Sequence, residues 1–303
     1  MTRWEQLVAE GRVEADAAIA PLTTYKLGGR ADFLARVGRL DDLTPLAEAM
    51  AEYPLPVLVV GRGSNIVVSD GGFGGLVLRL GGDLARITVD GGVTAGGGAS
   101  LPQLARAAVK SGRLGLEFMV GIPGTVGGAV RQNAGCFGRE VVDVLEKADV
   151  FDLRGGQLTT AAPTDLAMSY RSTSLLPTQI VTQASFVTEP GDPALGEEKM
   201  REITRWRRHH QPGGTLNAGS VFKNPPGDAA GRIIDSLGLK GLAVGGAAVS
   251  SKHANFFEAQ PGTRAIDVYR LVKQVGRIVE ERTGVRLQPE IQFVGDFKDS
   301  SHG

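Results

Sequence analysis

Glycine residues are concentrated in three short segments where the main chain itself could bind a ligand. Residues 120–135 (VGIPGTVGGAVRQNAG) contain five glycines and a single charged residue, Arg131. Residues 61–65 (GRGSN) follow an apolar run, and residues 94–100 (TAGGGAS) contain three consecutive glycines. Glycine lets the backbone approach a flat ring closely, and exposed main-chain amides can surround an anion. These segments together predict a site for a long ligand that carries phosphates and a flat ring.

The segment at 61–65 differs from the common phosphate-binding motifs. Gly61 and Gly63 fit the dinucleotide fingerprint, but Ile66 stands where the third glycine belongs. No Gly-Lys-Ser/Thr follows either, so the segment is not a P-loop. Its consecutive amides can still form an anion-binding nest. The alternative is a simple turn between two strands.

Helices and strands are expected on both sides of these segments. Apolar residues recur at helical spacing, or alternate as in strands, between clusters of turn residues. We expect helices at residues 1–20, 40–53, 100–112, 197–212, 228–241 and 261–284. We expect strands within residues 23–37, 56–80, 84–98, 141–162, 178–189 and 285–295, with a hairpin turn at Arg154–Gly156.

The ends of several elements also have sequence signals. Ser100 and Thr263 are the expected N-caps of two helices, and Gly112 is expected just after the helix at 100–112. The stretch EPGDPALG at 189–196 predicts a linker, and we expect residues 296–303 to fray.

Composition limits the class of protein. Hydrophobic residues make up 42% and charged residues 22% of the 303 residues, as in globular proteins. The 33 basic and 33 acidic residues cancel, which argues against nucleic acid or an anionic membrane as the main partner. A single cysteine, Cys136, excludes an intramolecular disulfide framework. There is no apolar run of about 18 residues and no signal-peptide pattern, so we expect a cytoplasmic protein.

Seven segments resemble, in order and spacing, those of the UDP-N-acetylenolpyruvoylglucosamine reductase (UDP-N-acetylmuramate dehydrogenase) family. They lie between about residues 20 and 295 and read TYKLGGRA, VVGRGSNIVVSDGGFGG, GLEFMVGIPGTVGGAVRQNAG, YRSTSL, AGSVFKNP, SSKHANFF and LQPEIQFVG. The resemblance implies an α+β fold: an FAD-binding fold of the vanillyl-alcohol-oxidase type in two subdomains, then a C-terminal substrate-binding domain. The expected boundaries are residues 1–80, 81–192 and 193–303.

The resemblance implies FAD as the ligand of the glycine segments. Residues 61–65 would hold its pyrophosphate and residues 121–135 would lie along its ring, where polar atoms of Gln132 and Asn133 could bond ring heteroatoms. Because the four histidines lie outside the glycine segments, we expect non-covalent FAD. The expected cofactor-binding residues are Tyr25, Leu27, Gly61, Arg62, Gly63, Ser64, Asn65, Gly121, Ile122, Pro123, Gly124, Thr125, Gly127, Gly128, Ala129, Gln132, Asn133 and Gly135.

Three catalytic residues follow from the resemblance. Ser220 in AGSVFKNP matches the proton-donating serine of the family, Arg171 in YRSTS its arginine, and Glu290 in LQPEIQF its glutamate. A guanidinium stays charged and can stabilise an enolate as it forms. Without the resemblance, Ser220 would be a strand serine bonded to backbone, Arg171 a surface residue, and Glu290 a carboxylate facing water.

The family reaction also implies partners. NADPH would reduce FAD, and UDP-N-acetyl-3-O-(1-carboxyvinyl)-glucosamine would be reduced by it. Between Lys223 and Lys252 no insertion corresponds to the tyrosine-bearing lid loop, so the chain is similar to the shorter subtype. We expect a monomer without a metal site. The expected substrate-binding residues are Tyr170, Arg207, Gln211, Asn224, Lys252 and Asn255.

Two other functions fit parts of the pattern. An oxidase of the same flavin fold would be favoured by a flavin-linking histidine in the glycine segments, which contain none. A flavin-binding or nucleotide-binding regulatory module would not require Arg171, Ser220 and Glu290 all to fall in matching motifs. The reductase is therefore the leading hypothesis.

Overall fold

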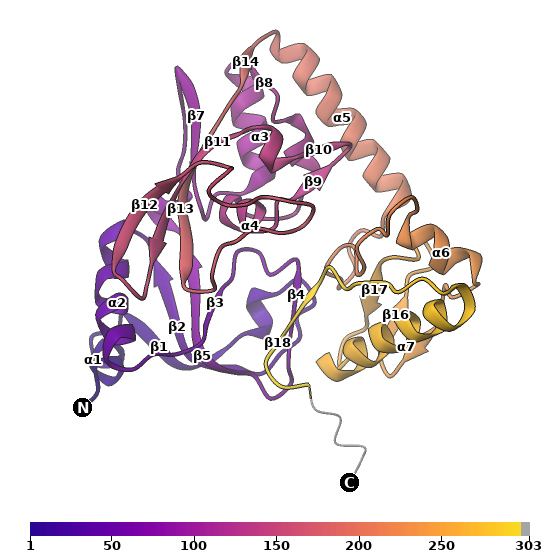
Figure 1. Cartoon of the computed structure of the whole chain (residues 1–303), viewed down its shortest axis with the longest axis horizontal. Coiled ribbons are helices and arrows are strands. Elements are labelled where there is room, and N and C mark those ends of the chain that lie inside the picture. Colours follow the sequence, from indigo (N-terminus) through magenta and orange to yellow (C-terminus); the bar gives the residue numbers. More distant parts are fainter. Residues whose placement is uncertain (298–303) are drawn as a thin grey trace. The chain divides into compact units, whose positions relative to one another are not determined.

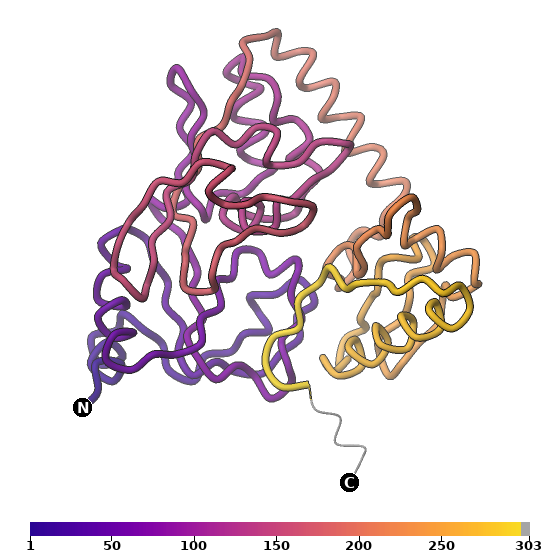
Figure 2. Tube along the Cα trace, in the orientation of Figure 1, coloured from indigo at the N-terminus to yellow at the C-terminus, as the bar shows by residue number. Residues whose placement is uncertain are grey.

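The computed structural model describes residues 1–297. The chain forms two compact units, each assembled from separate parts of the sequence. Unit 1 contains residues 1–16, 32–62 and 75–207, and unit 2 contains residues 17–31, 63–74 and the chain from 208 onward. Figure 2 lets the reader follow this trace from end to end. The three consecutive domains expected from the sequence stay a prediction.

Two sheets organise the first two-thirds of the chain (Figure 1). One has the strand order β1-β2-β5-β3, in which β3 and β5 are parallel. The other has the order β12-β11-β13-β7-β6, with antiparallel neighbours throughout. The strands of the first are Val13–Ala18 (β1), Arg30–Val37 (β2), Phe73–Leu80 (β5) and Val57–Val59 (β3). Those of the second are Gln157–Ala161 (β12), Leu145–Asp152 (β11), Gln179–Phe186 (β13), Gly92–Gly96 (β7) and Ile87–Asp90 (β6).

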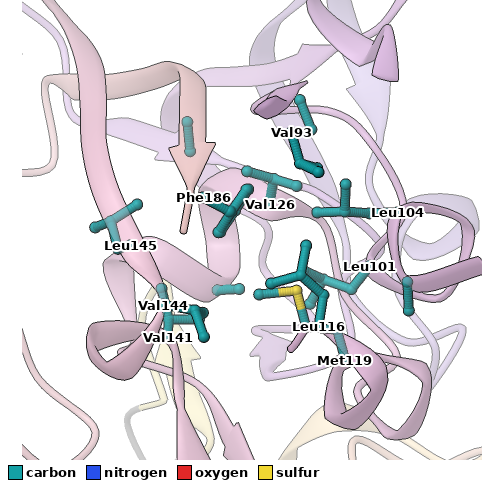
Figure 3. Close-up of a cluster of buried hydrophobic side chains, with 14 of the residues drawn as sticks. Val93, Leu101, Leu104, Leu116, Met119, Val126, Val141, Val144, Leu145 and Phe186 are labelled. Atoms are coloured by element: carbon teal, nitrogen blue, oxygen red, sulfur yellow. The ribbon is translucent and has the colours of Figure 1, made fainter. Parts of the chain in front are cut away.

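Helices bury apolar faces against these sheets in unit 1. Helices α1 (Arg3–Ala9) and α2 (Leu43–Glu52) belong to a core with β3 and β5. A second core joins α3 (Leu101–Lys110), α4 (Val126–Arg131) and the larger sheet. Figure 3 shows Leu101 and Leu104 of α3, Val126 of α4 and Phe186 of β13 in this core. Because α4 is built from the third glycine segment, this core fixes that segment in place.

Helix α5 and several short elements complete unit 1. Helix α5 (Pro193–His210) belongs to this unit up to Arg207. The short strands are Arg113–Leu114 (β8), Gly135–Cys136 (β9), Arg139–Glu140 (β10) and Glu189–Pro190 (β14). The 3₁₀ turns are Leu40–Asp42 (η2), Gly82–Ala85 (η3), Glu117–Gly121 (η4) and Val141–Asp143 (η5).

Unit 2 packs around the long helix α7 (Ala265–Thr283). Its buried face, which includes Val268, Leu271 and Val275, lies in one core with Tyr25 and Val67 from distant parts of the chain. Strand β18 (Gln292–Val294) pairs in parallel with strand β4 (Ile66–Val68), and Figure 1 shows the two side by side. The other elements of unit 2 are Ala20–Leu22 (η1), Ala230–Ser236 (α6), Ala243–Val244 (β15), Ala247–Val249 (β16) and Phe257–Ala259 (β17).

Most elements expected from the periodicity are confirmed. Helices α2, α3, α6 and α7, the hairpin β11–β12, and strands β6, β7 and β13 lie in their expected segments. Gly112 follows α3 at φ +69°. Most of the tail expected to fray, residues 296–303, lies outside the described residues.

Two helix predictions are wrong at their ends. The helix expected at 1–20 ends at Ala9, and β1 follows, because Gly11 turns the chain at φ +70°. The N-cap of α7 is Arg264 and not Thr263. The carboxylate of Asp70 accepts hydrogen bonds from the amides of Ala265 and Ile266. A residue distant in sequence therefore caps this helix.

Two other predictions differ in extent. Half of the expected linker 189–196 is helical, because α5 already begins at Pro193. The Oδ1 of Asp192 accepts a hydrogen bond from the amide of Ala194 at 2.9 Å, and proline is favourable in a first helical turn. The strand expected at 285–295 is regular only over β18. Within residues 1–297, no helix combines the length and the apolar character needed to cross a membrane.

Candidate functional site

One pocket of unit 1 brings the three glycine segments together. Gly61 comes from the first, Gly97 and Gly98 from the second, and Thr125, Gly127 and Gly128 from the third. The pocket is a narrow cavity of about 40 Å³ that is open to solvent. Its remaining lining is mostly aliphatic, and Arg131 and Gln179 are its polar side chains. The aliphatic residues are Val59, Val60, Leu80, Ile180 and Val181.

Several of these glycines allow one loop to pack directly against another. A Cβ at Gly61 would lie 2.3 Å from Oγ1 of Thr125, and a Cβ at Gly97 would lie 1.9 Å from the carbonyl oxygen of Val181. A Cβ at Gly128, in contrast, would meet only Thr125 Oγ1, at 3.6 Å. Much of the glycine content therefore shapes the pocket through close backbone packing, and Gly128 leaves room beside it.

Arg131 is the cationic residue of the pocket lining. Its guanidinium donates to the carbonyl oxygens of Leu175 at 3.1 Å and Leu176 at 2.9 Å, and also to that of Gln179. Burial lowers the pKa of Arg131, although a guanidinium remains charged at neutral pH. Because these hydrogen-bond partners are neutral carbonyls, the positive charge of Arg131 makes the pocket favourable for an anionic ligand.

Arg171, expected to be catalytic, lies against the end of the third glycine segment. Its Nη1 donates to the carbonyl of Asn133 and to Oε1 of Glu140, both at 3.2 Å, and its Nη2 donates to the carbonyl of Gly135 at 3.2 Å. The Tyr170 ring lies 5.0 Å from the guanidinium carbon and is half exposed to solvent. The expected catalytic arginine thus contacts the segment expected to bind the cofactor.

A second guanidinium lies close to this group. Burial is the largest effect on the Cys136 thiol and raises its pKa, whereas the positive charges of Arg207 and Arg171 act to lower it. Burial also lowers the pKa of Arg207. A Cβ at Gly121 would meet both Cys136 Sγ, at 2.7 Å, and Arg207 Cδ, at 3.5 Å. Two cations therefore flank the segment Gly135–Cys136, which suits a ligand with carboxylate or phosphate groups.

In unit 2, the second half of the first glycine segment lies beside Glu290. The Nδ2 of Asn65 donates to the carbonyl of Glu290 at 3.2 Å, and the amide of Gln292 donates to the carbonyl of Asn65 at 2.9 Å. Among the described residues, the amides of Gly63, Ser64 and Asn65 have no hydrogen-bond acceptor. They are therefore available to bind an anion.

Ser220 lies close to Glu290 in the same unit. The amide of Glu290 donates to the carbonyl of Val221 at 2.7 Å, and Ser220 forms a bridge with Phe256. Ser220 is partly buried, and its hydroxyl makes no hydrogen bond to a described residue. The alternative of a serine bonded to backbone is therefore not what the structure shows.

Other expected site residues have their side chains engaged within unit 2. The hydroxyl of Tyr25 is completely buried and donates to the carbonyl of Phe257, and Leu27 belongs to the same core. Oδ1 of Asn224 accepts from the amide of Ala230 at the start of α6. The Nζ of Lys252 donates to the carbonyl of Arg208 at 2.6 Å from an exposed position.

Asn255 and Asn133 use their amide groups inside the protein. In unit 2, Asn255 accepts from the amide of Phe222 at 2.9 Å and donates to its carbonyl at 2.8 Å. In unit 1, Asn133 is fully buried and donates to Glu140 and Ser169. These amides hold the surrounding backbone, so they would influence a ligand indirectly.

Comparison with known proteins identifies the family. Residues 211–294 match the model of the "UDP-N-acetylenolpyruvoylglucosamine reductase, C-terminal domain", and residues 31–161 match the model of the "FAD binding domain". A UDP-N-acetylenolpyruvoylglucosamine reductase from Paramagnetospirillum magneticum is 42% identical over 98% of this chain and 97% of that protein. The chain belongs to the UDP-N-acetylenolpyruvoylglucosamine reductase family.

Two further members of this reductase family support the assignment. A UDP-N-acetylenolpyruvoylglucosamine reductase 2 from Symbiobacterium thermophilum is 45% identical over 94% of this chain and 93% of that protein. The crystal structure of the reductase from Thermus caldophilus aligns with a TM-score of 0.82 at 37% identity, over 94% of this chain and 99% of that one. The expected α+β fold, with an FAD-binding part and the C-terminal domain of the family, is confirmed.

The residues of the pocket fit an FAD-dependent oxidoreductase, the enzyme class of this family. The pocket combines aliphatic walls, close-packed glycine backbone and the Arg131 cation, which suit a ligand with flat rings and phosphates. Most of its lining, from Val59 to Arg131, lies within the matched FAD-binding segment.

Sequence reasoning missed part of this lining. Leu80, Arg131 and residues 179–181 line the pocket although none was expected to bind the cofactor. The charge of Arg131 in an otherwise apolar segment was a signal that could have identified it. Residues 179–181 (Gln-Ile-Val) read only as the start of an ordinary strand, so only the pairing of β13 brings them to the pocket.

Proposed function

We propose that this chain catalyses the NADPH-dependent reduction of the enolpyruvyl ether of UDP-N-acetylglucosamine to UDP-N-acetylmuramate, a step of peptidoglycan precursor synthesis. The relatives named for this activity match nearly the whole chain. The structural observation that carries the proposal is the unbonded hydroxyl of Ser220, beside the segment of Glu290. We also propose a cytoplasmic monomer.

FAD, when bound without a covalent link, would supply the hydride that it receives from NADPH. The side chains must then bind the substrate and manage one proton. Arg171 would bind the substrate carboxylate and stabilise the negative charge that develops on the carbon attached to it. The network around its guanidinium holds this charge in place before the substrate arrives.

Ser220 would donate the proton to that same carbon. Hydride addition converts the vinyl CH₂ into a methyl group, and protonation of the neighbouring carbon completes the lactyl ether. A hydroxyl is a weak acid, so the donation depends on the strongly basic carbon that accepts the proton. Glu290 would polarise the carboxylate end of the substrate as an acid.

The diphosphate of the substrate would be bound by cations. Arg207 and Lys252 carry positive charge, while Tyr170 and Gln211 would add polar contacts. Asn224 and Asn255 would act by holding the chain around Ser220 and α6, because their amide oxygens already accept hydrogen bonds.

The test uses the yellow holoenzyme under anaerobic conditions. NADPH alone should bleach the flavin absorbance, and UDP-N-acetyl-3-O-(1-carboxyvinyl)-glucosamine should restore it. Protein that stays bleached with this compound, but regains colour with oxygen alone, would overturn the reductase and favour an oxidase. Protein that NADPH does not bleach would favour a flavin-binding module without this activity.

The variant Ser220→Ala separates the two half-reactions. Flavin reduction by NADPH should be nearly unchanged, whereas reoxidation by the sugar nucleotide should slow by about 10²–10⁴-fold because only the proton source is lost. Stopped-flow absorbance measures both steps. Ser236→Ala, a helix serine of the same unit, is the control. If both half-reactions of Ser220→Ala slow equally, Ser220 supports the fold or the cofactor instead.

A further inference from the structure

The Arg171 guanidinium is held by a carboxylate for which the proposed reaction has no role. Glu140 lies at the end of the β9–β10 hairpin, and its Oε1 accepts from Arg171 Nη1 at 3.2 Å. Both side chains are largely buried, with 16% of the Arg171 side chain and 28% of the Glu140 side chain exposed. An ion pair shielded to this degree is stronger than a surface pair.

Glu140 is itself fixed from the other side. Its Oε2 accepts from Nδ2 of Asn133 at 2.8 Å. Asn133 is completely buried, donates a second bond to the carbonyl of Ser169 at 3.1 Å and accepts one from the amide of Val142 at 2.9 Å. Because both oxygens of Glu140 and the side-chain amide of Asn133 have hydrogen-bond partners, the carboxylate has little freedom to move.

The backbone at Arg171 gives a second reason for this arrangement. Ser169 and Ser172 exchange two hydrogen bonds of 3.0 Å, so Tyr170 and Arg171 form the tip of a tight turn. Arg171 has φ +54°, a left-handed conformation that is unfavourable for a residue with a Cβ. A non-glycine residue at such a position is retained where the direction of its side chain matters.

We propose that Glu140 is the positioning residue for Arg171 in the oxidation of the reduced enzyme by substrate. This inference rests on the proposed function. Glu140 and the carbonyls of Asn133 and Gly135 fix one edge of the guanidinium, and they set its plane before the substrate carboxylate binds. A preset orientation lowers the barrier of the chemical step, and its loss can cost on the order of a hundredfold in rate.

The charge of Glu140 makes a distinguishing prediction. An anion beside Arg171 weakens the attraction of that arginine for a second anion, the substrate carboxylate. Removing it should therefore leave substrate binding as tight as before or tighter, while the chemical step slows. A residue that only supported the fold would weaken binding and rate together.

The experiment is a double-mutant cycle on the holoenzyme with Glu140→Ala, Arg171→Lys and both together. We expect Glu140→Ala to slow flavin reoxidation by the sugar nucleotide by about 10–100-fold without raising KM, and to leave reduction by NADPH unchanged. Added to Arg171→Lys, it should slow reoxidation by less than about threefold, because Glu140 acts through Arg171. Glu146→Ala, an exposed carboxylate on β11, is the matched control.

If the rate losses of Glu140→Ala and Arg171→Lys multiply in the double variant, Glu140 does not act through Arg171 and the proposal is overturned. A Glu140→Ala variant with a raised KM and an unchanged kcat would also overturn it. If Glu140→Ala does not fold, Glu140→Gln replaces it: one oxygen can still accept from Arg171, so an intermediate rate is expected, and a wild-type rate overturns the proposal. Wild-type protein that the substrate does not reoxidise would refute the proposed function instead. The two failures are therefore distinguishable.

Discussion

The titratable ring of His253 contacts the backbone segment that pairs with Ser220. Its Nδ1 accepts from the amide of Asn255 at 3.2 Å, and its ring packs edge-on against Phe256 with 4.8 Å between centroids. Burial is the largest cause that lowers the pKa of His253, followed by the charge of Lys240. Asp235 opposes this shift and His210 adds to it. The folded protein therefore favours the neutral ring.

This shift predicts a stability that depends on pH. The unfolded chain binds a proton at His253 below about pH 6.5, whereas the folded chain does so only at lower pH. The stabilisation is thus complete above about pH 6.5 and is lost as the pH falls toward the folded pKa. Relative to His253→Asn, which keeps an acceptor but does not titrate, the wild-type free energy of unfolding should fall between about pH 7 and 5.

Urea unfolding at several pH values measures this difference. The slope should stay below about 1.4 kcal/mol per pH unit, because a single imidazole takes up at most one proton. His209→Asn, at an exposed position of α5, is the control for replacing a histidine. Parallel curves for wild type and His253→Asn would contradict the prediction.

For single residues, the sequence indicated which side chains matter but not which atoms they hydrogen-bond. The motifs point to Asn133, Asn224 and Asn255 as binding residues, and the structure shows what their side-chain amides bond within their own units. An amide suits a ligand and a backbone equally well, since it carries both donors and acceptors. Only the fold shows that these amides already bond protein atoms.

The loop that carries Arg171 connects β12 to β13 and contains a second strained position. Ala167 has φ +43° and is exposed, at a turn between Ala162 and Ser174. A methyl group at positive φ costs free energy that glycine avoids. Arg131 donates hydrogen bonds to the carbonyls of Leu175 and Leu176 and so fixes the C-terminal end of the loop. The loop is thus held at its end and strained in the middle.

Replacing Ala167 by glycine should relieve this strain. We expect Ala167→Gly to raise the free energy of unfolding by about 0.5–1 kcal/mol, because the gain at positive φ exceeds the added entropy of the unfolded chain. Ala162→Gly, an exposed residue of the same loop without positive φ, should lower stability or leave it unchanged. Urea unfolding of both variants tests the sign, and a destabilised Ala167→Gly would refute the strain.

Element boundaries could be read from the sequence where the signal is local. The periodicity of α3 and the Gly-Gly turn of β11–β12 lie entirely within the segments that they define. The start of α7 depends on Asp70, almost two hundred residues earlier, and β18 depends on its pairing with β4. Signals of this kind are visible only once distant segments have been brought together.

On the scale of the whole molecule, unit 2 is completed by two segments from the first quarter of the chain. Residues 17–31 supply Tyr25, whose hydroxyl donates to the carbonyl of Phe257 at 2.8 Å. Residues 63–74 supply β4, which pairs with β18, and Asp70, which caps α7. The composition shift at 189–196 suggested a C-terminal domain of consecutive residues. It could not reveal these segments, because their contacts are distant in sequence.

This arrangement predicts that residues 208–303 do not fold alone. The fragment lacks Tyr25, Leu27 and Val67 of its core, and each such side chain contributes about 1.5–3 kcal/mol when buried. Together these losses are comparable to the ~5–15 kcal/mol that stabilises a typical domain. We expect the isolated fragment to give a poorly dispersed amide proton spectrum and no cooperative urea transition, whereas the full chain gives both. Supplying residues 17–74 as a second chain should restore part of the dispersion. A fragment that unfolds cooperatively by itself would show that the two early segments are accessory to unit 2, and that residues 208–303 already contain a sufficient core.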